Sequence, residues 1–341
     1  MVAGSSVEVQ REPISFPSSD GESTISGCVW TPAPAAGAAP AADATSPAFA
    51  AATPAPRGIV QLVHGMAEHV GRYDDLACHL VECGFVVCGD DHIGHGLSVS
   101  DPSKLGCLPP KGKDFLIEDE HQLRSLVSAR FPPQTPYIMY GHSMGSFITR
   151  AYLARHGQGL AGAILCGTAQ QPLALSRIGH ALARILGFFR GDEYRSSFLD
   201  DMGAGAYSKQ IENARTPFDW LCTDPAVVDA YLADDLCGFM FSVGGYAALT
   251  DLTGEIATKA CASKVPKDLP LFFIAGDQDP VGDCGAGVRA AADQHAAAGV
   301  LDVQVKLYPG MRHEIHNEPG HAQVYEDVVE WMEAHACKNV M

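Results

Sequence analysis

The sequence predicts an α/β fold with a mostly parallel central sheet flanked by helices and interrupted by an inserted helical cap. After residue 57, short apolar runs of strand length alternate with segments of helical spacing. This alternation is typical of a parallel sheet covered on both faces. Between 171 and 265 the spacing is helical and no strong buried strand occurs. We therefore expect a core formed by 1–170 and 266–341 and a cap formed by 171–265.

The first elements precede the alternating region. Residues 7–16 and 23–31 are rich in β-branched and alternating residues, which predicts two antiparallel strands. The segment 32–56 is almost entirely Ala, Pro, Gly, Ser and Thr. It cannot bury apolar surface, so we expect a flexible surface loop. Because the residues before this loop are too few for a stable domain, their strands should form the edge of the sheet that follows.

The core elements then follow in order, with apolar runs as buried strands and helical spacing between them. In the cap, Asp224 followed by Pro225 is a helix start signal, because it combines an N-cap side chain with proline at the first helical position. The expected core strands are 58–63, 85–88, 137–140, 160–166, 269–275 and 303–308. The expected core helices are 72–83, 112–130, 143–155, 281–298 and 322–336.

Composition narrows the class of protein. A hydrophobic fraction of 47% supports a large buried core. The formal net charge of −17 repels phosphate-rich partners, so nucleic acid is not expected as a ligand. The 11 cysteines are scattered and form no C-x-x-C pair, and the first ten residues lack a signal-peptide pattern. Together with the lack of any apolar run of roughly 18 to 20 residues, this predicts a cytoplasmic protein with free thiols.

The segment Gly141-His142-Ser143-Met144-Gly145 lies between a predicted strand and a predicted helix. G-x-S-x-G in this context is the pattern of a nucleophile elbow, a strained turn that exposes the serine hydroxyl. The flanking glycines let neighbouring backbone approach, and the helix N-terminus adds a positive dipole and free N–H groups. Ser143 is thus the candidate nucleophile. The alternative is an ordinary glycine-rich turn between a strand and a helix.

A serine hydroxyl is a poor nucleophile unless a base takes its proton and an acid orients that base. Asp279 follows the strand 269–275, and His313 follows the strand 303–308. The chain order serine, acid, histidine fits this kind of elbow, so Asp279 is the candidate acid and His313 the candidate base. The competitors are Asp277 and Asp283 for the acid, and His316 and His321 for the base.

Acyl transfer also needs an oxyanion hole of preorganised N–H donors. One donor should be the backbone N–H of Met144, the residue after the nucleophile, and the second should come from the loop after an early strand. The strand ending at 63 is followed by His64-Gly65-Met66, so we assign the Met66 N–H. This chemistry is complete without a metal or an organic cofactor.

With these residues in place, the chain resembles the monoacylglycerol lipase and lysophospholipase group of α/β hydrolases. The likeness covers roughly 57–170 and 266–336, whereas the cap does not match in detail. It implies the α/β-hydrolase fold, a triad of Ser143, Asp279 and His313, and oxyanion donors at Met66 and Met144. The segments that carry it are H-G-M-A-E-H-V-G-R-Y at 64–73, D-H-I-G-H-G-L-S at 91–98, G-H-S-M-G at 141–145, G-D-Q-D at 276–279 and Y-P-G-M-R-H-E-I-H-N-E at 308–318.

The resemblance also implies a polar pocket for glycerol, with side chains at Glu68, Arg72 and His316. The alternative is that Glu68 and Arg72 form a structural ion pair that braces the oxyanion loop. In the cap, the apolar stretch Ile178–Phe189 is flanked by Arg177, Arg184 and Arg190, which suggests transient contact with a membrane surface. That stretch could instead pack on the core.

We therefore expect a serine hydrolase that cleaves carboxylic esters of lipids, a monoacylglycerol or a lysophospholipid, through an acyl-enzyme intermediate. A general carboxylesterase is the nearest alternative. A serine aminopeptidase of the same fold is another, in which acidic cap residues such as Asp192, Glu193 and Glu212 would hold the substrate ammonium group. A binding protein without catalysis is a third, although all three triad residues are present. Acyl-chain length, head group and oligomeric state stay open.

Overall fold

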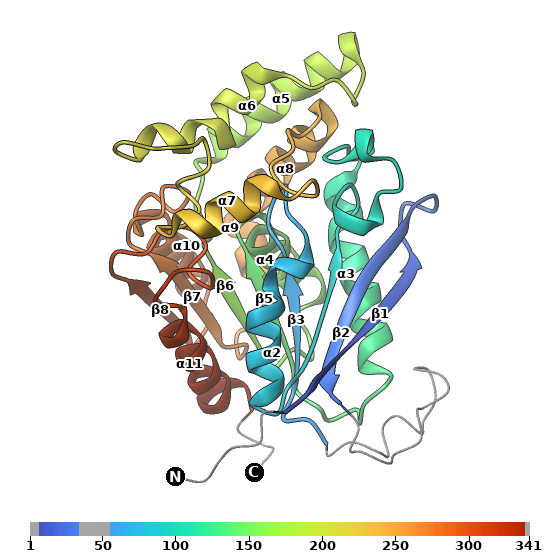
Figure 1. Ribbon diagram of the computed structural model, residues 1–341, viewed down its shortest axis with the longest axis vertical. Coiled ribbons are helices and arrows are strands. Elements are labelled where there is room, and N and C mark those ends of the chain that lie inside the picture. Colours follow the sequence, from blue (N-terminus) through green and yellow to red (C-terminus); the bar gives the residue numbers. More distant parts are fainter. Residues whose placement is uncertain (1–6, 34–54, 338–341) are drawn as a thin grey trace.

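A computed structural model describes residues 7–33 and 55–337 of the chain (Figure 1). Its centre is an eight-stranded sheet with the order β1-β2-β4-β3-β5-β6-β7-β8. The pair β1–β2 and the pair β2–β4 are antiparallel, and every other neighbouring pair is parallel. The strands are β1 Val9–Pro17, β2 Thr24–Pro32, β3 Ile59–Val63, β4 Val86–Asp91, β5 Tyr137–His142, β6 Gly162–Cys166, β7 Leu271–Gly276 and β8 Val303–Tyr308.

The strand pattern follows from where each strand lies in the sheet. Every residue of β3, β4, β5, β6 and β7 is buried, as expected of parallel strands covered on both faces. By contrast, β1 is an edge strand in which exposed and less exposed residues largely alternate. The expected mostly parallel sheet with an antiparallel edge is confirmed. Apart from its two ends, the loop expected at 32–56 lies outside the described residues.

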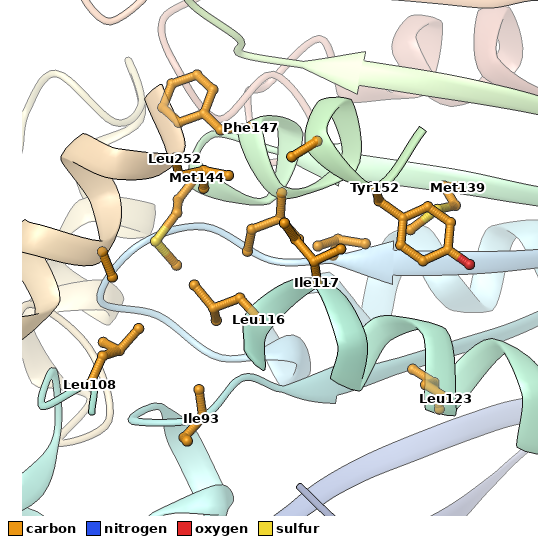
Figure 2. Close-up of a cluster of buried hydrophobic side chains, with 14 of the residues drawn as sticks. Ile93, Leu108, Leu116, Ile117, Leu123, Met139, Met144, Phe147, Tyr152 and Leu252 are labelled. Atoms are coloured by element: carbon orange, nitrogen blue, oxygen red, sulfur yellow. The ribbon is translucent and has the colours of Figure 1, made fainter. Parts of the chain in front are cut away.

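Helices cover both faces of the sheet. On one face, α2 and α11 pack against inward-pointing residues such as Leu62 and Tyr140. On the other face, α3, α4 and α10 cover residues such as Met139 and Phe273. Figure 2 shows part of this second layer, where Leu116 of α3 and Met144 of α4 meet Leu252 of α8. These helices are α2 Asp74–Glu82, α3 Gly112–Ser128, α4 Met144–His156, α8 Val243–Ile256, α10 Ala286–Ala297 and α11 His321–Trp331.

One core helix starts later than its sequence pattern predicts. The pattern gave a helix from 281, but α10 begins at Ala286. The reason is local, because Asp283, Cys284 and Gly285 have φ values of 50°, 50° and 93°. Such left-handed backbone cannot belong to a right-handed helix. These residues form a turn after β7 instead.

The chain between β6 and β7 is helical and contains one isolated bridge, Arg195–Ser242, but no strand. In Figure 1, α5, α6 and α7 lie above the carboxyl ends of the strands. By contrast, α8 and α9 pack against α4 of the core. A cap boundary at 265 therefore stays a prediction. The remaining helices of this segment are α5 Leu173–Arg190, α6 Ser197–Met202, η4 Ala204–Gln210, α7 Pro225–Ala233 and α9 Lys259–Lys264.

Short helical turns complete the chain around this framework. One of them, η1, connects the loop after β3 to α2 and becomes part of the site described below. The last turn of the described chain is a π-helical continuation of α11. These segments are η1 Val70–Tyr73, η2 Gly96–Ser98, η3 Pro102–Lys104 and η5 Met332–Ala336.

Candidate active site

Ser143 occupies the turn between β5 and α4 with φ 54° and ψ −121°, a left-handed conformation unusual for a residue with a side chain. Its N–H donates to the Cys166 carbonyl at 2.9 Å. The turn is so tight that a Cβ on Gly145 would lie 1.9 Å from the Val63 carbonyl oxygen, and one on Gly141 would lie 2.5 Å from the Gly145 oxygen. Both flanking positions therefore require glycine. This is the strained geometry of a nucleophile elbow.

Of the candidate acids and bases, the structure brings Asp279 and His313 together. Nδ1 of His313 lies 2.9 Å from Oδ2 of Asp279, and both side chains are buried. Oδ1 of Asp279 accepts the Val281 N–H at 2.9 Å, which fixes the carboxylate. Burial lowers the pKa of His313, but the charge and hydrogen bond of Asp279 raise it by more, so this pKa lies above 6.5. The arrangement suits a base oriented by an acid.

The competing residues have other partners. Asp277 accepts the Gly310 N–H at 2.8 Å and so ties β7 to the loop before His313. Asp283 belongs to the left-handed turn before α10. His321 lies 2.7 Å from the Glu318 carbonyl at the start of α11. The contacts of Asp277 and His321 give these two residues structural roles.

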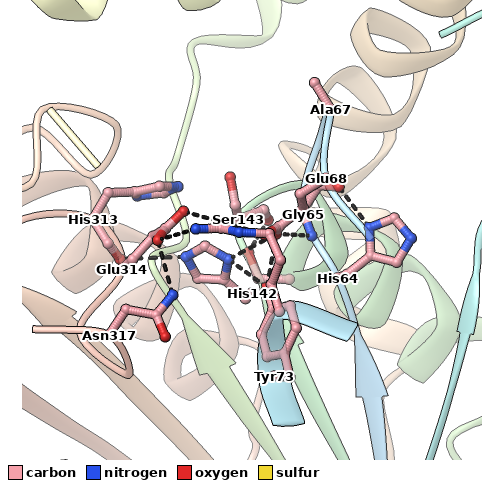
Figure 3. Close-up of polar contacts among 12 residues, drawn as sticks. His64, Gly65, Ala67, Glu68, Tyr73, His142, Ser143, His313, Glu314 and Asn317 are labelled. Carbon is pink, nitrogen blue, oxygen red and sulfur yellow. Dashed lines mark hydrogen bonds and ion pairs between the residues drawn. The ribbon is translucent and has the colours of Figure 1, made fainter. Parts of the chain in front are cut away.

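His313 and Ser143 line one cavity of about 250 Å³. Nε2 of His313 is buried and has no hydrogen-bond partner among the described residues, so it is free to take a proton. Figure 3 shows Ser143 with His142 and His313 around it. The walls are mostly apolar, and several come from the segment between β6 and β7. That segment contributes Tyr207, Phe218, Trp220, Leu221, Phe239 and Met240.

Met66 and Met144, the residues assigned as oxyanion donors, also line this cavity. Met144 is the first residue of α4, where backbone N–H groups lack partners inside the helix. The loop that carries Met66 passes close to the nucleophile, since a Cβ on Gly65 would lie 3.1 Å from Cβ of Ser143. Both candidate donors therefore belong to segments that lie close to Ser143.

His64 and His92 fix the start of this loop. The His92 N–H donates to Nε2 of His64 at 3.0 Å, so the proton of the neutral His64 ring is on Nδ1. That Nδ1 lies 2.8 Å from the Gly65 carbonyl oxygen, which shares a peptide group with the Met66 N–H. The two rings stack at 3.7 Å, and burial lowers the pKa of His64 well below 6.5. A neutral histidine thus contributes to the orientation of the peptide group that carries the Met66 N–H, a candidate oxyanion donor.

The residues expected to hold glycerol do not all meet in the catalytic cavity. Glu68 lines it, whereas Arg72 and His316 line a separate cavity. Glu68 is buried and accepts hydrogen bonds from the Gly65 N–H at 2.6 Å, from Arg72 at 2.6 Å and from the Tyr73 hydroxyl at 2.7 Å. The structural ion pair is therefore present. A glycerol contact of these residues stays a proposal.

His316 is buried between aromatic rings. It stacks on Tyr73 at 4.7 Å and meets the edge of His142 at 4.7 Å. Neither ring nitrogen has a hydrogen-bond partner among the described residues. Burial lowers the pKa of His316 to about 3. The ring is therefore neutral at physiological pH. It packs against His142, the residue before Ser143.

Sequence reasoning missed two residues that support the site. His142, inside the elbow, lies 2.8 Å from the Tyr73 hydroxyl through Nδ1 and 3.3 Å from the His313 carbonyl through Nε2. Glu314 binds Arg72 through both carboxylate oxygens. The sequence shows that His142 precedes Ser143 and that Glu314 follows His313. It does not indicate that Tyr73 and Arg72 are their partners.

Three groups of buried or half-buried side chains in the described parts of the chain bring metal-ligating atoms within 4.8 Å of one another. In two of them the histidine already contacts the carboxylates, with Nδ1 of His92 3.3 Å from Asp90 and 3.2 Å from Glu120, and Nε2 of His69 2.9 Å from Asp234. Ester hydrolysis by a serine needs no metal, and we assign none of the groups a role in it. The groups are His142–Cys166–His316, His69–Asp234–Cys237 and Asp90–His92–Glu120.

The parallel sheet and a serine elbow at its carboxyl edge define a hydrolase of the α/β-hydrolase fold. Residues 54–320 match the sequence family described as "Hydrolase_4: Serine aminopeptidase, S33". The chain belongs to this family of α/β hydrolases.

The relatives point to ester substrates. The chain is 34% identical over 287 residues to the monoacylglycerol lipase of Mycolicibacterium smegmatis. The aligned residues cover 82% of this chain and 89% of that lipase. It is 29% identical to the monoglyceride lipase of Homo sapiens over 78% of each chain. A thermostable carboxyl esterase from Bacillus coagulans, solved in complex with glycerol, superposes with a TM-score of 0.84 at 35% identity, covering 96% of this chain and 99% of that one. The protein is therefore an esterase- or lipase-like hydrolase.

Proposed function

We propose that the protein hydrolyses monoacylglycerols or closely related lipid esters through an acyl-enzyme formed on Ser143. The observation that carries this proposal is the buried His313, oriented by Asp279 through Nδ1 and free at Nε2 in the cavity that Ser143 lines. The monoacylglycerol and monoglyceride lipases among its relatives support the substrate class.

In this proposal, Nε2 of His313 takes the proton from Ser143 Oγ as the oxygen attacks the ester carbonyl carbon. The negative charge that forms on the carbonyl oxygen is stabilised by the backbone N–H groups of Met66 and Met144. The intermediate collapses with cleavage of the ester C–O bond, and the leaving alcohol takes the proton from His313. Water then repeats the sequence and releases the fatty acid, while Asp279 stabilises the imidazolium in both halves.

The lining of the cavity includes both apolar residues that suit an acyl chain and polar residues that suit a small alcohol. Aromatic and aliphatic residues such as Phe218, Phe239 and Leu249 offer an apolar wall, and Glu68 and Glu314 lie at the polar part of the lining. Burial of an acyl chain against such a wall is favourable in proportion to the apolar area removed from water. The glycerol bound by the Bacillus coagulans esterase supports an alcohol of this size.

We further propose that α5 contacts a lipid surface, from which the enzyme would take its substrate. Phe188 and Phe189 are 84% and 74% exposed, and Ile178 and Ile185 are also exposed on this helix. Arg177, Arg184 and Arg190 accompany them, as in helices that lie at an interface. Within the described residues, no helix is long and apolar enough to cross a membrane.

A peptidase of the same fold is the second candidate, because the matched family carries that description. It would need an acidic cap residue in the cavity to hold the substrate ammonium group, since Glu68 and Glu314 of the core already pair with Arg72. Asp192, Glu193 and Glu212 are not among the residues that line the cavity. Another cap carboxylate, Asp200, does line it, but it accepts a hydrogen bond from the Tyr246 hydroxyl. This keeps the peptidase a second candidate behind the esterase.

The test compares steady-state hydrolysis of a long-chain monoacylglycerol, a lysophospholipid, a short p-nitrophenyl ester and an aminoacyl arylamide, with Ser143→Ala as the blank. We expect the highest kcat/KM for the monoacylglycerol. Preference for the short ester would reduce the proposal to a general carboxylesterase, and preference for the arylamide would establish the peptidase. Activity retained in Ser143→Ala would overturn the nucleophile itself.

A further inference from the structure

The residue after the proposed oxyanion donor Met66 has an unusual backbone. Ala67 is buried and has φ 55°. A left-handed conformation costs free energy for any residue with a Cβ, so it persists only where surrounding contacts hold it. The contacts that hold Ala67 therefore influence where the Met66 N–H points.

Two of those contacts come from the cap. The Ala67 carbonyl oxygen accepts a hydrogen bond from the Tyr231 hydroxyl at 2.9 Å and another from the Gly238 N–H at 3.0 Å. Both donors lie in the segment between β6 and β7, at and beyond the end of α7. Two bonds to one oxygen fix the direction of the peptide group that follows Ala67.

Tyr231 is itself held in place. It is buried, its ring lies 4.8 Å below the Arg72 guanidinium, and it packs against Phe218 at 5.1 Å. Burial raises the pKa of Tyr231, so its hydroxyl keeps the proton that it donates. Nearby, His69 lies 2.9 Å from Asp234 and adds a further link between the cap and the same loop.

The Met66 peptide is thus anchored from both sides. On the upstream side, Nδ1 of His64 holds the Gly65 carbonyl, and Glu68 accepts the Gly65 N–H. Those anchors belong to the core. On the downstream side, the anchors of Ala67 belong to the cap.

We propose that Tyr231 is a positioning residue of the oxyanion hole: by holding the strained Ala67 carbonyl, it aims the Met66 N–H at the cavity and makes transition-state stabilisation depend on a seated cap. This inference rests on the proposed function, because it takes Met66 as an oxyanion donor. Tyr231 acts through the loop backbone and need not touch the reacting atoms. Removing its hydroxyl should therefore weaken transition-state binding and leave ground-state binding intact.

The experiment uses the full chain and the variant Tyr231→Phe, with Tyr152→Phe as the matched control. Tyr152, on α4, has a buried side chain outside the cavity, and its hydroxyl lies 3.0 Å from Nδ1 of His121 on α3. We would measure kcat and KM with a short p-nitrophenyl ester, the inhibition constant of a trifluoromethyl ketone that mimics the oxyanion, and the Tm. A donor in an oxyanion hole is worth about 100- to 1000-fold in kcat. A donor that is still present but points in a slightly different direction should cost less. We expect Tyr231→Phe to lose roughly tenfold in kcat and in inhibitor affinity, with KM unchanged.

A second variant separates positioning from packing. Glycine adopts positive φ readily, so Ala67→Gly should hold the loop conformation with less help from the cap. In that background Tyr231→Phe should lose much less activity than in the wild-type background. Equal losses in both backgrounds would contradict the role that we assign to Ala67.

The outcomes keep the two proposals apart. If the wild-type protein hydrolyses no ester, the proposed function fails, and the rate of fluorophosphonate labelling of Ser143 replaces kcat in the comparison because it also passes through an oxyanion. If Tyr231→Phe keeps kcat and inhibitor affinity within twofold of wild type, the positioning role is overturned. The role is also overturned if Tyr231→Phe lowers only the Tm, because the loss of the hydroxyl of any buried tyrosine would have that effect.

Discussion

Arg72 and Glu314 form a bidentate ion pair, with Nη1 2.6 Å from Oε1 and Nη2 2.7 Å from Oε2. Nη1 of Arg72 also donates to Glu68 at 2.6 Å. Arg72 belongs to the turn after the loop that carries Met66, and Glu314 follows the candidate base His313. One guanidinium therefore connects the loop that carries Met66 with the loop that carries His313, and the proposed chemistry requires these two loops to keep a fixed relative position. Burial raises the pKa of Glu314, but the charge and hydrogen bonds of Arg72 outweigh it and leave this pKa below 4.5.

Replacing Arg72 by methionine should strongly destabilise the protein. The variant leaves Glu68 and Glu314 buried without their cation, and breaking a buried pair in this way costs about 3–5 kcal/mol. Arg11→Met is the matched control, since its bidentate pair with Asp74 is exposed and worth at most about 1 kcal/mol. Urea unfolding at pH 7 gives both values. Equal losses would show that burial does not decide the contribution of this pair.

The same variant should respond to pH in a defined direction. In the wild type, Glu314 has a lowered pKa, so its contribution to stability is present above 4.5 and is lost as pH falls through the folded-state value. Without Arg72 the buried carboxylate binds a proton more readily. The stability gap between Arg72→Met and the wild type should therefore narrow between pH 7 and pH 5. A gap that widens in acid would contradict this account.

The pH–rate profile should report His313. A general base works only when neutral, so kcat/KM should rise with a midpoint above 6.5, because Asp279 raises the pKa of His313. In Asp279→Asn the charge of the carboxylate is lost, so the pKa of His313 and with it the midpoint should fall relative to the wild type, and the plateau rate should fall by roughly 10⁴. Asp277→Asn should keep both the midpoint and the rate. An unchanged midpoint in Asp279→Asn would assign the profile to another group.

Gly145→Ala should prevent stable folding. Its Cβ would lie 1.9 Å from the Val63 carbonyl oxygen, and neither backbone segment moves without disturbing the sheet. We expect a loss of about 3 kcal/mol or more from this overpacking. Gly254→Ala, inside α8, is the control, because its Cβ would meet nothing closer than Cβ of Ser176 at 3.6 Å. That variant should gain about 0.5–1 kcal/mol. Both changes are measured by thermal unfolding.

The double variant Phe188→Asp and Phe189→Asp should lose binding to lipid vesicles and keep activity on a dissolved short ester. The two rings are highly exposed and lie outside the catalytic cavity. Leu301→Asp is the control, since Leu301 is 82% exposed in the connection between α10 and β8. Sedimentation with anionic and neutral vesicles measures the binding. If the double variant binds as the wild type does, α5 is not the contact surface.

The sequence predicted the parts of the structure that depend on local pattern. The buried strands have apolar runs that no surface element would carry, and Ser143, Asp279 and His313 each follow a strand at the same edge of the sheet. The start of α10 could not be predicted in this way, because the left-handed turn at Asp283 and Cys284 depends on contacts around it. Gly282 and Gly285 disfavour a helix in this segment, but the spacing of the apolar residues does not register that signal.

Partners far apart in the chain were also beyond prediction. The ion pair of Glu68 and Arg72 was one of two alternatives that the sequence left open, but nothing local indicated that Glu314 would also bind the guanidinium. Tyr231 and Trp220 reach the site from a segment with no recognised motif. Their roles follow from tertiary packing, which fixes distances that spacing along the chain does not record.

The insertion between β6 and β7 also bears on protein engineering. These strands pair directly, with Ala163 opposite Leu271, so the chain leaves and re-enters the sheet at adjacent positions. The pairing of these strands therefore does not depend on the length of the insertion, and an exchange of α5 to α7 that keeps α8 and α9 against α4 should leave the sheet intact. The two donors to the Ala67 carbonyl are a different matter, because they come from the insertion itself. A chimaera with this part of the insertion from another enzyme would therefore need an equivalent pair of donors. Without them, it should fold correctly but hydrolyse its substrate slowly.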